Sequence, residues 1–241
     1  MKAIILCAGR GVRMRPLTDA TPKPLAPVGP GRRLIDFTVD ALRAAGVTEV
    51  VINTAHLAGA FDKIVGATYR GVRVAVSREG PTHATSLETK GGIVRALPLL
   101  SPGEEPFIAC AGDIVTAFDF STLASRLQAL KEGRYSAHLV LVPNPAFHPE
   151  GDMGIRDGRL DRQAKTYTYS GIGLFSPSLF AGEPDGFAKL FPWLLDKAGE
   201  QAVSAELYTG PWHNVGTVDE LKGLTAKLIA EGLYSGTSPR N

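Results

Sequence analysis

The sequence has few of the residues that build metal clusters or disulfide frameworks. Of its 241 residues only two are cysteines, Cys7 and Cys110, and both stand in apolar segments. No CxxC pair occurs, and the five histidines show no metal-ligand spacing. This pattern excludes a zinc finger and a disulfide-rich secreted domain. We therefore expect two buried, free thiols.

Long apolar runs and an excess of one charge are also missing. No run approaches the length of about 20 residues that a membrane helix needs, and the N-terminal MKAIILCAG is too short for a signal peptide. The net charge is +2 without a long basic stretch, so neither nucleic acid nor an anionic membrane is expected as a partner. A hydrophobic content of 44% is ordinary for a soluble globular protein. Without a signal peptide or membrane span we expect it in the cytoplasm, as a monomer or a small homo-oligomer.

What the sequence does have is a regular alternation of strand and helix patterns in its first half. We expect strands near residues 3–7, 49–53, 72–77 and 107–111, and helices near 34–45, 57–65 and 89–97. This order predicts an α/β fold with a mostly parallel sheet and helices on both faces. Ligands of such folds bind at the carboxyl ends of the strands.

The second half is less regular, and no linker or repeat separates it from the first. We expect helices near 120–131, 187–198 and 218–231, strands near 137–142, 169–175, 202–208 and 212–215, and a hairpin within 153–160. Pro192 is expected in the first turn of its helix. We predict a single domain over 1–241.

The most informative segment is the loop after the first strand, where Gly9 and Gly11 stand among Arg10, Arg13, Arg15 and Lys23. Glycines let backbone N–H groups approach an anion, and the cations suit a phosphate-rich ligand. A P-loop is excluded because GxxxxGK[ST] is absent, and Met14 stands where a dinucleotide fingerprint needs its third glycine. An ordinary strand-to-loop turn with solvated arginines is the alternative.

The same segment carries a specific resemblance. The pattern AxGxGxRMxPLTxxxPKP, from Ala8 to Pro24, resembles the opening motif of the sugar-1-phosphate nucleotidyltransferases. The resemblance implies a Rossmann-like, GT-A-like mixed sheet, with Ala8, Gly9 and Gly11 around the nucleotide phosphates. It also implies that Arg13 and Lys23 stabilise the charge that develops during transfer. The same resemblance implies a nucleotide-binding half near 1–120 and a sugar-binding half near 121–241.

A divalent cation is expected beside this loop. Asp113 follows a buried strand, where a carboxylate is costly unless it is paired, capped or bound to metal. The resemblance makes Asp113, next to Gly112, the first Mg²⁺ ligand. The second ligand in the family comes from W-x-[D/N]-x-G-T, which here places Asn214 where many relatives have Asp. A neutral amide oxygen holds Mg²⁺ more weakly than a carboxylate does.

The remaining contacts are implied by the resemblance. Base and ribose contacts fall on Glu79, Leu87 and Thr89, within 77–92, for which a solvated loop is the alternative. His83 lies in the same loop. Sugar contacts fall on Gly154, Tyr169, Ser170 and Gly171, which could equally be turn and strand residues. The family's E-K-P lysine has no counterpart, and Lys165 is the nearest candidate.

Within the family the sequence is most similar to N-acetylmuramic acid α-1-phosphate uridylyltransferases of peptidoglycan recycling, which make a UDP-sugar and pyrophosphate from UTP. The segments LETKGGI, LVPNPAFHPEGDMGI and YSGIGLF carry this similarity. Two alternatives remain open. One is another nucleotidyltransferase, acting on mannose 1-phosphate with GTP or on phosphocholine. The other is a non-catalytic nucleotide-binding regulatory module, which Asn214 keeps in consideration.

Overall fold

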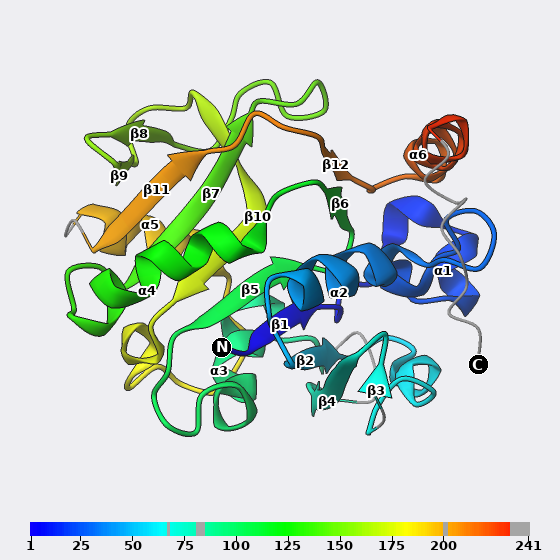
Figure 1. Cartoon of the computed structure of the whole chain (residues 1–241), viewed down its shortest axis with the longest axis horizontal. Helices are drawn as coiled ribbons and strands as arrows, with labels where there is room; N and C mark the ends of the chain where they lie inside the picture. Colours follow the sequence, from blue (N-terminus) through cyan, green and yellow to red (C-terminus); the bar gives the residue numbers. More distant parts are fainter. Residues whose placement is uncertain (67, 81–84, 200–201, 232–241) are drawn as a thin grey trace.

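The computed structural model describes residues 1–66, 68–80, 85–199 and 202–231. Ten strands of this part form one twisted sheet, in the order β3-β4-β2-β1-β5-β10-β7-β11-β9-β8, and two more form a separate ribbon (Figure 1). The strands are β1 (Ala3–Leu6), β2 (Glu49–Thr54), β3 (Thr68–Tyr69), β4 (Val72–Arg78), β5 (Phe107–Ala111), β6 (Ile114–Thr116), β7 (Ala137–Pro143), β8 (Gly154–Arg156), β9 (Arg159–Asp161), β10 (Tyr167–Phe175), β11 (Val203–Leu207) and β12 (Trp212–Asn214).

The sheet is mixed, and its polarity changes at β10. Strands β4, β2, β1 and β5 are parallel, whereas β10 runs antiparallel to both β5 and β7. The first residues of β10 therefore lie at the edge where β1 and β5 end. The predicted α/β architecture with a mostly parallel sheet is confirmed.

Helices cover both faces of the sheet. Helices α2 and α4 pack on one face and α3 and α5 on the other, and each face buries its own apolar cluster. The α-helices are α1 (Leu17–Ala20), α2 (Leu34–Ala44), α3 (Glu88–Leu100), α4 (Ala124–Lys131), α5 (Leu190–Gly199) and α6 (Val218–Ala230). A third cluster holds α6 against the loop after β1, through Met14, Val215 and Leu221.

Most predicted elements are confirmed within a few residues, and position 192 does fall in the first turn of α5. The hairpin around Asp157 and Gly158 is also confirmed, and both residues have positive φ. The helix predicted over 57–65 is wrong, since only Ala58–Phe61 forms a short 3-10 helix. Leu57, the first residue of the predicted range, has φ 53°, a left-handed conformation outside the right-handed helical region.

Three short elements were not predicted, namely strand β3, helix α1 and strand β6. The four-residue helix α1 lies in the proline-rich loop between β1 and α2. Strand β6 follows the Gly112-Asp113 turn and pairs antiparallel with β12, with Asn214 opposite Ile114. This β6–β12 ribbon stands apart from the main sheet and leads into α6 (Figure 1). It brings the Asp113 and Asn214 segments together although they are far apart in sequence.

Candidate functional site

A cleft of about 340 Å³ lies at the carboxyl ends of the parallel strands. One wall is the loop from Ala8 to Val12, and the other is formed by Ser86, Glu88 and Thr89. Asn53 and Asp113 also line it, from the ends of β2 and β5. The prediction that the first loop and Asp113 share one edge of the sheet is confirmed.

The two glycines of the first loop have different surroundings. Gly11 has φ +64°, and a methyl group there would lie 2.9 Å from Thr18 Cγ2, so the position demands glycine. Thr18 in turn donates from its hydroxyl to the Gly11 carbonyl at 2.8 Å. Gly9 has nothing within 4 Å of the place a methyl group would take. Its backbone is therefore open to a ligand in the cleft.

Three cations predicted for the phosphate region differ in their surroundings. Lys23 forms an ion pair with the Asp113 carboxylate. Arg10 lines the cleft. Arg13 lies against the backbone of Gly216, where a methyl group would come within 2.7 Å of its Nη2. Neither arginine has a hydrogen bond or ion pair to another described residue, so both guanidinium groups are available to an anion.

Asp113 and Asn214 are held by the β6–β12 ribbon. The backbone N–H of Val215 donates to the Asp113 carbonyl at 2.9 Å, and Gly112 N–H donates to Leu6 at 3.0 Å. Gly112 itself is confined, because a methyl group there would lie 2.9 Å from the Leu6 carbonyl oxygen. The side-chain Oδ1 of Asn214 is buried without a hydrogen-bond partner in the described structure. An unsatisfied buried oxygen is costly, and a bound cation would satisfy it.

Few side chains of the site could bind a metal ion. No group of three or more His, Cys, Asp or Glu side chains that could hold a metal ion occurs among the described residues. One carboxylate and one amide oxygen suit Mg²⁺, which keeps waters and commonly shares phosphate ligands. Cys7 and Cys110 are buried and free, as predicted, and burial raises the pKa of both thiols.

Glu79 lies beneath the second wall of the cleft. Its two carboxylate oxygens accept from Asn53 Nδ2 at 2.6 Å and from Leu87 N–H at 2.7 Å. Burial raises the pKa of this carboxyl group. Glu79, Leu87 and Gly112 do not line the cleft, whereas Thr89 does. His83 and the rest of 81–84 lie outside the described residues.

The predicted sugar contacts surround the start of β10. The register of β10 shifts between Tyr169 and Ile172, and Gly171 occupies this irregularity with φ +83°. Ser170 is buried and donates to the Val140 carbonyl at 2.7 Å. Gly154 packs on Ala164, whose Cβ would lie 2.5 Å from a methyl group there. Ser170 and Gly154 thus have structural contacts, and their predicted contact with a sugar stays a prediction.

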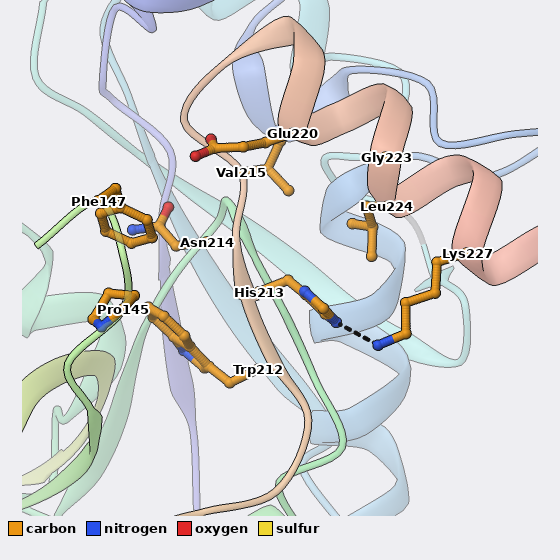
Figure 2. A pocket seen from close by; sticks show the side chains of 10 residues that line it. All are labelled: Pro145, Phe147, Trp212, His213, Asn214, Val215, Glu220, Gly223, Leu224 and Lys227. Atoms are coloured by element: carbon orange, nitrogen blue, oxygen red, sulfur yellow. Dashed lines mark hydrogen bonds between the residues drawn. The ribbon is translucent and has the colours of Figure 1, made fainter.

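Aromatic side chains bridge β12 and the loop after β7. Trp212 Nε1 donates to the Ser170 carbonyl at 2.9 Å, and its ring lies 6.4 Å from that of Phe147. Figure 2 shows a second pocket, of about 370 Å³, between this pair and helix α6. Trp212 and Asn214 point to the Phe147 side of β12, and His213 points to Lys227. Sequence reasoning did not predict Asn53, Phe147 or this pocket.

Comparisons with known proteins agree with this geometry. Residues 2–148 match the family model described as nucleotidyl transferase. The chain belongs to this family. It is 43% identical to "N-acetylmuramate alpha-1-phosphate uridylyltransferase" of Neisseria meningitidis, over 92% of this chain and 96% of that protein. It is 32% identical to a protein of the same name from Caulobacter vibrioides, over 95% of each.

Solved structures support the fold. A putative glucose-1-phosphate thymidylyltransferase from Bacillus anthracis superposes with a TM-score of 0.77, at 19% identity and over 94% of each chain. A UDP-glucose pyrophosphorylase complexed with UDP-glucose gives 0.73 at 15% identity, over 95% of this chain and 98% of that one. The predicted nucleotidyltransferase fold and family are therefore confirmed. No helix of the described residues is long and apolar enough to cross a membrane.

Proposed function

We propose that the protein transfers the uridylyl group of UTP to N-acetylmuramic acid α-1-phosphate and releases pyrophosphate. The observation that carries the proposal is the cleft in which the open loop at Gly9 faces Asp113 and its partner Lys23. The choice of base and sugar rests on two relatives of that activity that match nearly the whole chain. The product would be UDP-N-acetylmuramic acid, an intermediate of peptidoglycan recycling, and we expect the reaction in the cytoplasm.

The reaction needs no general base. A phosphomonoester has its second pKa near about 6, so the sugar phosphate is mostly dianionic at neutral pH. One of its oxygens attacks the α-phosphorus in line, and the bond from that phosphorus to the bridging oxygen of pyrophosphate breaks. Arg13 and Lys23 stabilise the negative charge on the phosphate oxygens, and backbone N–H groups at Gly9 and Gly11 orient the triphosphate.

Asp113 and Asn214 would hold Mg²⁺, and the unsatisfied Oδ1 of Asn214 fits that role. Bound Mg²⁺ would neutralise phosphate charge. Thr89 would contact the nucleoside from the second wall, with Glu79, Leu87 and Gly112 supporting the walls from beneath. Every residue lining the cleft lies between Leu6 and Asp113, which supports a nucleotide-binding half near 1–120. Tyr169 and Gly171 would contact the sugar from the other half.

A guanylyltransferase is the second candidate. The chain is 28% identical to "Mannose-1-phosphate guanylyltransferase catalytic subunit beta" of Danio rerio over 90% of its length, but covers only 61% of that protein. The incomplete coverage and lower identity favour the uridylyltransferase. A regulatory module that binds nucleotide without turnover would use the same cleft.

Pyrophosphate release with Mg²⁺ tests the proposal, using four nucleoside triphosphates against the 1-phosphates of N-acetylmuramic acid, N-acetylglucosamine, glucose and mannose. We expect release with UTP and the muramic sugar. Release with GTP and mannose 1-phosphate would establish the second candidate. Nucleotide binding without release from any pair would contradict both enzymes and favour the regulatory module.

A further inference from the structure

A chain of buried hydrogen bonds crosses the floor of the cleft and joins its two walls. The backbone N–H of Cys7, where the first loop begins, donates to Asn53 Oδ1 at 2.7 Å. Asn53 Nδ2 donates to Glu79 at 2.6 Å, and the other Glu79 oxygen accepts from Leu87 N–H at 2.7 Å. Leu87 directly precedes Glu88 and Thr89 of the second wall.

The two side chains in this series of hydrogen bonds are protected from water and closely packed. Asn53 is 3% exposed and Glu79 is 4% exposed. Helix α3 packs closely on both side chains and leaves room for them only because position 92 is glycine. A methyl group there would lie 2.4 Å from Glu79 Oε1 and 2.7 Å from Asn53 Nδ2. A displacement of either wall would therefore break a buried hydrogen bond, which costs more than an exposed one.

We propose that Asn53 and Glu79 are positioning residues that fix the distance between the first loop and the second wall of the cleft. Nucleotide affinity then depends on the order of hydrogen-bond donors and acceptors along these two side chains. The inference rests on the proposed function, since it assumes that this cleft binds the nucleotide. It assigns Glu79 a role that acts through the backbone of Leu87, in place of the direct base contact expected from the sequence.

The backbone groups at the two ends of this series of hydrogen bonds fix its order of donors and acceptors. Cys7 N–H and Leu87 N–H can only donate, so the two side chains between them must supply three acceptors and one donor. An ionised Glu79 with Asn53 does so. Asn53→Asp alone sets two carboxylates face to face. Glu79→Gln alone opposes two N–H donors at one point, whichever way either amide is turned.

Combining the two substitutions restores the series of hydrogen bonds. In N53D with E79Q, the carboxylate at position 53 accepts from Cys7 N–H and from the amide at position 79, whose oxygen accepts from Leu87 N–H. The negative charge now lies at position 53 instead of position 79, and each of the three hydrogen bonds again joins a donor to an acceptor. A double-mutant cycle therefore separates the hydrogen-bond order from the identity of either residue.

The test is the dissociation constant of UTP, measured by calorimetry on the full chain, together with kcat and KM. We expect each single variant to bind UTP at least about tenfold more weakly and the double variant to bind within about threefold of wild type. The matched control is Thr54→Val, because Thr54 is also buried on β2 and its hydroxyl has no partner in the described structure. It should bind as wild type does.

Urea unfolding of each variant separates positioning from stability. Single variants that unfold more easily yet bind UTP normally would overturn the inference, as would a double variant whose binding loss equals the product of the single losses. If a single variant does not fold, the affinity of the double variant decides alone. A wild-type chain that binds no nucleoside triphosphate would refute the proposed function and this inference together, whereas normal binding by the single variants would refute the inference only.

Discussion

Lys23 and Asp113 form an ion pair at the edge of the cleft, with side chains 15% and 21% exposed. They lie far apart in the sequence, since Lys23 follows α1 and Asp113 follows β5. Their pairing places a cation beside the carboxylate that we propose as a Mg²⁺ ligand. A metal ion bound at Asp113 would therefore compete with Lys23 for this carboxylate.

The first prediction follows from this competition. Lys23→Gln should lower kcat by about 10²-fold or more, because a positive charge beside the transferred phosphate is lost. The same variant should bind Mn²⁺ more tightly than wild type in the absence of nucleotide. Titration followed by electron paramagnetic resonance measures the second effect. Weaker Mn²⁺ binding in this variant would contradict competition between Lys23 and the metal.

Removing the carboxylate should have the opposite effect on metal binding. Asp113→Ala should reduce turnover by at least about 10²-fold and weaken Mn²⁺ binding, while circular dichroism stays unchanged. Asp119→Ala is the control, because Asp119 caps a short helix at Ser121 and lies outside the cleft. Near-normal turnover of Asp113→Ala at saturating Mg²⁺ would show that Asp113 is not a metal ligand.

The Asn214 substitution tests the second oxygen. Asn214→Asp should preserve turnover and lower the Mg²⁺ concentration at half-maximal rate, because a carboxylate binds Mg²⁺ more strongly than an amide does. A Mg²⁺ titration of the initial rate measures this. Complete loss of activity would indicate that the amide N–H₂ group of Asn214 has its own role.

The two loop glycines give a matched pair. Gly11→Ala should lower the free energy of unfolding by about 1–3 kcal/mol, because alanine is strained at φ +64° and would contact Thr18. Gly9→Ala should leave stability within about 0.5 kcal/mol of wild type but raise the KM for UTP about tenfold. Equal effects of both substitutions on stability would contradict the open position of Gly9.

A fifth prediction concerns pH and the docking of the segment before α5 on α3. Glu183 accepts from Lys90 and from Trp193 Nε1, and the hydrogen bond from Lys90 is the largest cause of its lowered pKa. A carboxyl group with a lowered pKa in the folded state stabilises the fold above its ordinary pKa, and that contribution is lost as the pH falls through the lowered value.

Glu183→Gln should therefore cost about 1 kcal/mol of unfolding free energy at pH 7, and the difference from wild type should shrink as the pH falls through the lowered pKa of Glu183. Urea unfolding across this pH range measures it. Asp185→Asn is the control, because the Arg95–Asp185 pair is more exposed. A difference that stays constant with pH would contradict the role of the ionised Glu183.

The elements with a clear apolar period were predictable from the sequence. Strand β5 and helix α2 fall within one residue of the expected ranges, because each buries a regular set of apolar side chains. The carboxyl ends of the parallel strands then brought the first loop and Asp113 to one edge. Strand β6 has only three residues, and its partner β12 lies about a hundred residues later, so no local pattern marks it.

The residues missed in the site depend on tertiary contacts. Asn53 ends a run of apolar residues on a buried strand, and an isolated amide in that place was a signal for a buried hydrogen bond. Its partners Cys7 and Glu79 lie 46 and 26 positions away, so the sequence could not identify them. Likewise, nothing in YSGIGLF indicates that Ser170 turns inward toward Val140.

The reversal of strand direction at β10 has a consequence for how this protein can change. Because β10 begins where β1 and β5 end, Gly171 reaches the edge of the sheet that carries the cleft, without any insertion in the segments that line it. The loop between β7 and β8 and the start of β10 are separate in sequence from the segments around Gly9 and Thr89. If they contact the acceptor sugar as proposed, exchanging 144–152 and 167–171 would change acceptor preference without altering the loop at Gly9 or the second wall of the cleft.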